Sequence, residues 1–244
     1  MKLDILGFWG GTPELGGATT GYLLHTNEGT LLIDCGSGVM SQLSTVMPYY
    51  EIDAAILTHL HFDHMADIGI LQYGFNRALR NHWVDGPIQI IAPNEPKLLW
   101  DSIQSQDAIM NTLNPNSTYE LIGAQVDFLA VNHSIPSYAV KVTYDNKVFV
   151  FSSDTTYYES LIDFAKNADV FLCEATNFEG SIHSTGKGHM SAAEAGLLAH
   201  EARVKTLILT HLPSDGNFAK MQSEAEAQFH GKVIMASDIK SYAF

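Results

Sequence analysis

Four side chains that can bind a metal ion lie within six residues of one another, in Thr58-His59-Leu60-His61-Phe62-Asp63-His64. In an extended segment, residues two apart face the same side, so the rings of His59 and His61 can bind one ion. Asp63 and His64 follow where the chain turns, and we expect them to face a second ion. Imidazole and carboxylate ligands together suit zinc, manganese or iron better than calcium or magnesium. The alternative is a cluster of solvated histidines that binds no metal. The position of the motif directly after an apolar strand, with an aspartate among the histidines, argues against this alternative.

Three further residues of these types each follow an apolar, strand-like run: His133, Asp154 and His211. With His59-Leu60-His61-Phe62-Asp63-His64 they resemble, in order, the HxHxDH signature and the later ligands of the metallo-β-lactamase superfamily. Ser-Ser-Asp-Thr around Asp154 is similar to the Gly-Asp-Thr of that family. The resemblance spans nearly the whole chain, from Asp34-Cys35-Gly36 to His211.

The resemblance implies two bound divalent cations, Zn²⁺ in the first place, with Mn²⁺ or Fe as alternatives. The ligands that it implies are His59, His61 and His133 for one ion, Asp63, His64 and His211 for the other, and Asp154 as a bridge. Two ions about 3.5–4 Å apart can share a hydroxide, lower its pKa and bind a phosphate oxygen. Asp63 therefore also counts as catalytic, since its loss should abolish turnover. In this superfamily a bridging aspartate in place of a cysteine favours phosphodiester chemistry over β-lactam or thioester chemistry.

An in-line attack on phosphorus needs an acid for the departing alkoxide, and His189 is the candidate. It lies in Gly188-His189-Met190-Ser191, just before an expected helix, where the ribonuclease Z-like branch has a histidine that assists the leaving group. Glu174, in Cys173-Glu174-Ala175-Thr176, could orient the ring and raise its pKa. The alternatives are a surface histidine at a helix start and a carboxylate with a purely structural hydrogen bond.

Spacing and charge both argue against processing of transfer RNA. Ribonuclease Z carries a long RNA-gripping arm between the ligands that match His133 and Asp154, and here only 20 residues separate them. With 13 basic and 27 acidic residues, the net charge of −14 also disfavours a stable nucleic-acid complex. The expected function is that of a metal-dependent hydrolase, a phosphodiesterase for a small or cyclic phosphodiester. The alternatives are a ribonuclease Z-type endonuclease, a lactone or thioester hydrolase, and a non-catalytic sensor.

Strand-like and helical segments alternate along the chain without a linker between them, which predicts a layered α/β or α+β domain. The expected strands are 3–9, 21–25, 31–34, 54–58, 88–92, 126–131, 139–144, 148–151, 170–173, 207–210 and 233–236. The expected helices are 38–47, 67–78, 96–110, 160–168, 192–202 and 218–229. The resemblance specifies α+β, a four-layer αββα sandwich of two mixed sheets flanked by helices, in a single domain over residues 1–244.

Three local patterns make sharper predictions. Ile56-Leu57-Thr58-His59-Leu60 recurs as residues 208–212, which we interpret as two related halves that each deliver a histidine to one shared rim. Ser191 and Glu194 fit a capping box at a helix start. Asp145-Asn146 between two strands is a hairpin signal. The glycines at positions 7–17 could let the backbone approach the metal rim, although tight turns would explain them equally well.

The remaining features bear on the surroundings of the protein. No apolar run approaches the roughly 20 residues of a membrane span, and no signal peptide is visible, so we expect a cytoplasmic protein without a membrane partner. Cys35 and Cys173 then predict buried, reduced thiols. His183 lies in a polar loop that could approach substrate. Residues 82–122, with an amphipathic helix expected over 100–113, form either a lid or the face of a possible homodimer.

Overall fold

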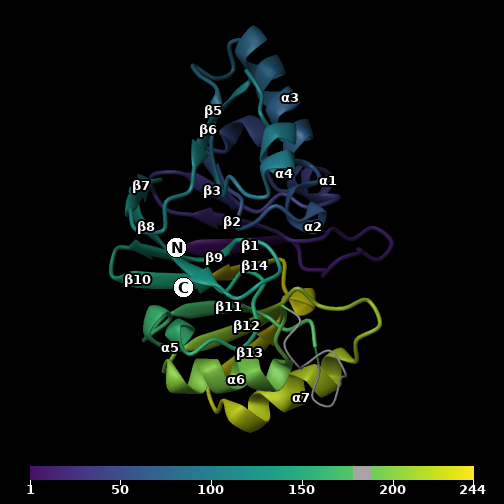
Figure 1. Ribbon diagram of the computed structural model, residues 1–244, viewed down its shortest axis with the longest axis vertical. Helices are drawn as coiled ribbons and strands as arrows, with labels where there is room; N and C mark the ends of the chain where they lie inside the picture. Colours follow the sequence, from purple (N-terminus) through teal and green to yellow (C-terminus); the bar gives the residue numbers. More distant parts are fainter. Residues whose placement is uncertain (178–187) are drawn as a thin grey trace.

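Two sheets stacked face to face form the centre of the computed structural model, which describes residues 1–177 and 188–244 (Figure 1). In sheet order, the first contains β14 (Ser241–Ala243), β1 (Lys2–Gly7), β2 (Gly21–His25), β3 (Thr30–Ile33), β4 (Ala54–Ile56), β5 (Ile88–Ala92) and β6 (Ala108–Thr112). The second contains β13 (Lys232–Met235), β12 (Thr206–Thr210), β11 (Val170–Glu174), β10 (Lys147–Phe151), β9 (Ser137–Tyr144), β8 (Ala124–Val131) and β7 (Tyr119–Leu121).

Helices cover the outer face of each sheet (Figure 1). The first sheet carries α1 (Val39–Leu43), α2 (Phe62–Met65), α3 (Ile68–Arg80) and α4 (Lys97–Ser102), and the second carries α5 (Ser160–Phe164), α6 (Ala192–Glu201) and α7 (Phe218–Gln228). Two 3₁₀ turns, Tyr49–Glu51 and Ala236–Asp238, complete the described elements. Each sheet contains parallel and antiparallel pairs. The predicted α+β fold of two mixed sheets flanked by helices is therefore confirmed.

Side chains alternate between two apolar layers along the central strands, because successive residues of a strand point to opposite faces. In β3, Leu31 and Ile33 pack between the sheets, whereas Leu32 packs under the helices. In β12, Ile208 packs between the sheets, and Leu207 and Leu209 face the helices. Strands buried on both faces read as continuous apolar runs, which is how they were recognisable in the sequence.

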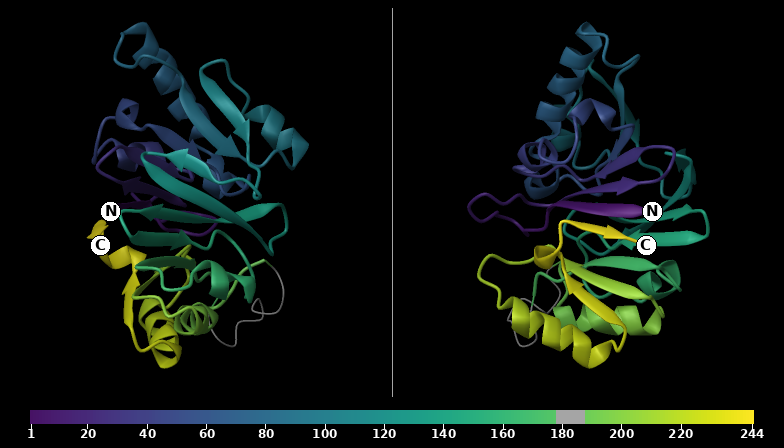
Figure 2. Two further views of the ribbon diagram at one scale, coloured as in Figure 1. Left: turned by 90° about the vertical axis from the view of Figure 1, so that its left-hand side faces the viewer. Right: turned by 180° about the vertical axis from the view of Figure 1, so that it is seen from behind.

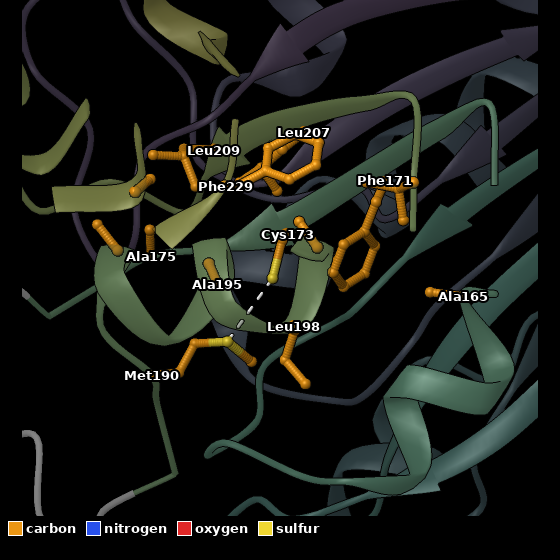
Figure 3. Packing of buried hydrophobic residues seen from close by; sticks show 14 of the residues in the cluster. Ala165, Phe171, Cys173, Ala175, Met190, Ala195, Leu198, Leu207, Leu209 and Phe229 are labelled. Carbon is orange, nitrogen blue, oxygen red and sulfur yellow. Dashed lines mark hydrogen bonds between the residues drawn. The ribbon is translucent and has the colours of Figure 1, made fainter. Parts of the chain in front are cut away.

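The helix-facing core of the second sheet is closely packed (Figure 3). Phe171 and Leu209 from the strands face Ala195 and Leu198 from α6. The thiol of Cys173 lies 3.6 Å from the sulfur of Met190. Cys35 and Cys173 are both buried and form no disulfide, and burial raises the pKa of each thiol well above its ordinary value. The prediction of buried, reduced thiols agrees with this structure.

Two of the sharp local predictions are confirmed. Asp145 and Asn146 both adopt positive φ, 47° and 60°, between the paired residues Tyr144 and Lys147, as a two-residue hairpin requires. At the start of α6, the hydroxyl of Ser191 accepts a hydrogen bond from the backbone of Glu194, whose carboxylate accepts one from the Ser191 N–H.

The helix predicted over 96–110 is correct only at its start, where α4 covers Lys97–Ser102, and the amphipathic helix predicted over 100–113 is wrong. Helix α4 ends at Ser102, and Ala108–Thr112 form β6, which pairs in parallel with β5 at the edge of the first sheet. Ala108 is buried, Ile109 is 46 % exposed and Met110 is partly buried, so the exposed Ile109 lies between two residues that are more buried. The apolar residues suited either period over so short a run, and the neighbouring strand decided between them.

Other differences are smaller. Helices α1 and α5 end at Leu43 and Phe164, four residues before their predicted ends. The three-residue strands β7 and β14 were not predicted, since their pairing with distant partners defines them. That pairing brings the chain ends together, where the Met1 amino group donates to the carbonyl of Phe244 at 3.1 Å (Figure 2). No helix in the described ranges 1–177 and 188–244 combines the length and apolar character that a bilayer crossing requires.

Asp169, just before β11, provides a pH-dependent test of the fold. Its carboxylate accepts hydrogen bonds from the Val148 N–H at 2.9 Å and from Lys205 at 2.7 Å. Burial raises the pKa of Asp169, but these hydrogen bonds outweigh it and leave the pKa lowered. The charge therefore stabilises the fold above the unfolded-state pKa of about 3.9, and this stabilisation is lost as the pH falls through the folded-state value.

Asp169→Asn should lower the free energy of unfolding by about 1 kcal/mol at neutral pH. The difference from wild type should vanish in acid, where the native carboxyl is also neutral. Urea unfolding at a series of pH values measures both. Asp145→Asn, in the exposed hairpin turn, is the matched control. A deficit of Asp169→Asn that persists unchanged into acid would show that the charge is not the cause.

Candidate metal centre

All seven predicted metal ligands lie at one end of the sheet stack, and each comes from a segment that follows a strand. His59 and His61 lie between β4 and α2, and Asp63 and His64 lie in α2. His133, Asp154 and His211 follow β8, β10 and β12. The ligand atoms of His59, His61 and His133 form one compact group, and those of Asp63, His64, Asp154 and His211 form another, with no two atoms of a group more than 4.8 Å apart. Each group contains one of the two ligand sets expected from the sequence, and Asp154, expected as a bridge, belongs to the second group.

Asp154 lies at the centre of the cluster. Its Oδ2 is 3.3 Å from Nε2 of both His64 and His211, 3.7 Å from Nε2 of His59 and 3.9 Å from Nε2 of His133. Its Oδ1 is buried and has no hydrogen-bond partner among the described residues. A buried oxygen without a donor is costly unless a cation or water meets it. Oxygen and imidazole ligands around such an oxygen therefore fit a pair of divalent cations.

The charges of Asp154 and of the first group of histidines also suit metal binding. Burial raises the pKa of Asp154, but His211 and His64 outweigh it and hold the pKa well below its ordinary value. Burial and neighbouring rings lower the pKa of His59, His61 and His133. These three rings are therefore neutral near pH 7, which is the form that binds a metal ion.

The ring of His64 is oriented by Asp34, which lies at the end of β3. The Nδ1–H of His64 donates to Asp34 Oδ2 at 2.7 Å, which leaves Nε2 to face Asp154. Thr58 holds the same carboxylate in place through its N–H and its hydroxyl, at 2.7 and 2.8 Å. Asp34 is fully buried with φ of 60°. In the sequence it marked only the start of the resemblance, and its contact with His64 was not predicted.

The glycine-rich start of the chain does approach the rim. The Gly11 N–H donates to Asp63 Oδ2 at 2.9 Å, and the same oxygen lies 3.1 Å from His211 Nε2. Burial raises the pKa of Asp63, but His211 and His64 outweigh it and lower the pKa strongly. A Cβ atom at Gly10 would lie 2.7 Å from His211 Nδ1. The close approach of the backbone, rather than turn geometry alone, therefore requires glycine at this position.

Gly10→Ala should displace the His211 ring and weaken metal binding, at a cost of about 1–3 kcal/mol for forced overpacking. Chelator competition measures the loss of affinity. Gly86→Ala is the matched control, since a Cβ there would have no neighbour within 4 Å. Equal affinities for the two variants would show that the rim tolerates the added methyl group.

His189 and Glu174 meet as predicted. His189 Nδ1 lies 3.0 Å from Glu174 Oε1, and Glu174 is fully buried. The ring of His189 stacks on that of His211, with centroids 5.2 Å apart. Burial lowers the pKa of His189, but the Glu174 carboxylate outweighs it and raises the pKa to about 9. His189 is also near enough to His133 and Asp154 to bind a cation together with them. The hydrogen bond of His189 to Glu174 favours the role of a general acid over that of a metal ligand.

Two further contacts of the candidate site were not predicted from the sequence. The hydroxyl of Thr176 lies between Glu174 and His211. The Nδ1 of His133 is 2.8 Å from the carbonyl of Gly188. The two Thr-His repeats do deliver His59 and His211 to one rim, as predicted. His183 lies outside the described residues.

Comparisons with known proteins agree with this fold. A family model for the beta-lactamase superfamily domain matches residues 30–212. The probable metallo-hydrolase YhfI of Bacillus subtilis is 34 % identical over 245 residues, with 97 % of each chain covered. The crystal structure of YhfI, described as a metallo-beta-lactamase fold protein, superimposes with a TM-score of 0.94 over 99 % of this chain and 98 % of that one.

More distant solved structures share the fold. Human tRNase Z, short form, is 20 % identical with a TM-score of 0.76, covering 100 % of this chain and 99 % of its own. A diphosphatase from the PhnP family is 15 % identical with a TM-score of 0.76, covering 100 % and 97 %.

Proposed function

We propose that this chain, which belongs to the beta-lactamase superfamily, is a metal-dependent phosphodiesterase for small or cyclic phosphodiesters, with residues 1–244 as one catalytic domain. The observation that carries the proposal is the position of Asp154. Its Oδ2 faces imidazoles from both ligand groups, and its Oδ1 is buried without a partner among the described residues. The relatedness to YhfI supports a metallo-hydrolase, and the phosphodiester substrate is our own step.

The donor set suits zinc, with manganese and iron as alternatives. One cation would be held by His59, His61 and His133, the other by Asp63, His64 and His211, and Asp154 would contact both. A pair of bound divalent cations supplies a water of lowered pKa and positive charge for the phosphate oxygens.

Side chains of this protein supply the remaining steps. His189, kept protonated by Glu174, donates its proton to the departing alkoxide. Because Nδ1 of His189 is hydrogen-bonded to Glu174, its Nε2 is the atom available to the leaving group. Asp34 orients His64 through a direct hydrogen bond to Nδ1, so that the ligand nitrogen Nε2 need not reorganise during the reaction.

A small substrate is favoured over transfer RNA by the segment between His133 and Asp154. Strands β9 and β10 and their two-residue turn occupy this segment, so no RNA-binding arm projects from it. The net charge of −14 also opposes binding to a polyanion. The fold is shared with human tRNase Z, but a shared fold does not specify the substrate.

The test combines metal analysis with a substrate panel. We expect two equivalents of divalent metal and hydrolysis of bis-p-nitrophenyl phosphate, or of 2′,3′- or 3′,5′-cyclic nucleotides, abolished in Asp63→Ala. The panel includes a lactone, a thioester and a precursor transfer RNA. Turnover of one of these alone would replace the proposal with that activity. Metal-loaded protein that binds a small ligand and hydrolyses nothing would make it a sensor.

A further inference from the structure

The hydroxyl of Thr176 links the proposed acid pair, His189 and Glu174, to the proposed metal ligand His211. Its Oγ1 lies 2.8 Å from Glu174 Oε2 and 2.7 Å from His211 Nδ1. The other oxygen of Glu174, Oε1, lies 3.0 Å from Nδ1 of His189. A single buried carboxylate is thus hydrogen-bonded directly to the proposed acid and, through one hydroxyl, to a proposed metal ligand.

Proton counting assigns a direction to this chain of hydrogen bonds. Nε2 of His211 points into the cluster, 3.1 Å from Asp63 Oδ2 and 3.3 Å from Asp154 Oδ2. A ring nitrogen that binds a cation carries no proton, so the proton of His211 lies on Nδ1 and is donated to Thr176 Oγ1. The single hydroxyl proton of Thr176 then goes to Glu174 at 2.8 Å, because a charged acceptor outcompetes the His211 carbonyl at 3.1 Å.

The first half of the chain contains the same arrangement. Nδ1 of His59 lies 3.2 Å from Thr58 Oγ1, whose hydroxyl donates to Asp34 Oδ2 at 2.8 Å. Asp34 also accepts directly from His64. In both halves one buried carboxylate therefore contacts one histidine directly and a second histidine through a threonine hydroxyl.

The sequence repeat does not account for the threonine that links Glu174 to His211 in the second half. In Thr58-His59 the threonine that precedes the histidine makes the link. In Thr210-His211 the corresponding threonine is instead 2.6 Å from the hydroxyl of Tyr22. Thr176, which lies 35 residues before His211, takes the position that Thr58 has in the first half.

We infer that Thr176 is a positioning residue that sets the tautomer and orientation of His211 and couples them to Glu174. The inference rests on the proposed function in taking His211 as a metal ligand. Partners of this kind around a ligating histidine typically contribute about 10–100-fold to metal affinity. A threonine that only satisfied Glu174 would contribute to folding stability and would leave metal affinity unchanged.

The test compares Thr176→Val, which keeps the branched shape and loses the hydroxyl, with Thr176→Ser, which keeps the hydroxyl. Zn²⁺ affinity is measured on the full chain by chelator competition, and the Nδ1–H proton of His211 is followed by NMR of protein with ¹⁵N-labelled histidine. We expect Thr176→Val to bind at least one ion roughly 10–100-fold more weakly and to lose or shift the His211 Nδ1–H signal. Thr176→Ser should restore both.

Thr30→Val is the matched control, since Thr30 is also buried and its hydroxyl lies 3.0 Å from Nδ1 of His25, outside the site. It should leave Zn²⁺ affinity unchanged. Thermal unfolding of the metal-free proteins separates a folding defect from a binding defect. Wild-type affinity and an unaltered His211 signal in folded Thr176→Val would overturn the inference while the phosphodiesterase proposal stands. A wild-type protein that binds no metal would instead overturn the proposed function.

Discussion

His189→Ala is expected to lower kcat for a phosphodiester by roughly 10²–10⁴-fold, the usual contribution of a general acid, and to leave both metal ions bound. The reason is geometric. The hydrogen bond of Nδ1 to Glu174 engages one side of the ring, and its pKa of about 9 keeps a proton available at neutral pH. None of the three proposed ligands of the first ion depends on His189 for its own hydrogen bond to the protein.

The leaving group makes this prediction specific. A p-nitrophenolate departs with little help from an acid, whereas an alkoxide needs the proton. The loss in His189→Ala should therefore be much larger for a substrate with an alkyl leaving group than for bis-p-nitrophenyl phosphate. Steady-state kinetics on the two substrates, with metal content measured on the same samples, decides the matter. His200→Ala, an exposed histidine of α6, should behave as wild type.

Two outcomes would contradict the acid role. An equal loss on both substrates would indicate that His189 acts elsewhere than on the leaving group. A loss of bound metal in His189→Ala would instead identify it as a ligand, shared with His133 and Asp154, a grouping that the distances also allow.

Asp154→Asn is expected to remove the ability to hold two metal ions and, with it, hydrolysis. The carboxylate is 1 % exposed and faces Nε2 of His59, His64, His133 and His211. Removing one partner of a buried charge pair costs about 3–5 kcal/mol, and about 1.4 kcal/mol is tenfold in affinity. Zinc affinity should therefore fall roughly 10²–10⁴-fold.

Metal content after dialysis and isothermal titration with Zn²⁺ measure this loss. The amide keeps the size of the side chain, so the fold should be retained, as circular dichroism will show. Asp145→Asn, in the exposed turn between β9 and β10, controls for the loss of one negative charge. Two tightly bound ions in Asp154→Asn would refute the central position that we assign to this carboxylate.

The sequence alone predicted the candidate ligands that the structure brings together, for a physical reason. Each candidate ligand directly follows a buried strand, or lies in the short segment after one. In the second sheet β8, β10 and β12 point the same way, so the segments that follow them share one edge. His59 and His61 are two apart in an extended segment, which places both rings on one side. The turn at Asp145-Asn146 and the cap at Ser191 were equally predictable, because their hydrogen bonds are local.

What the tertiary structure decided is what depends on residues far apart in the chain. Residues 108–112 became a strand because β5 offered them a partner, and β7 and β14 exist only through such pairing. The hydrogen bonds of Asp34 to His64 and of Thr176 to His211 join residues 30 and 35 positions apart. A periodicity reports which face of an element is apolar, but it carries no information on which hydroxyl or carboxylate from another strand will meet a given ring nitrogen. Only the packing of the two sheets determines those contacts.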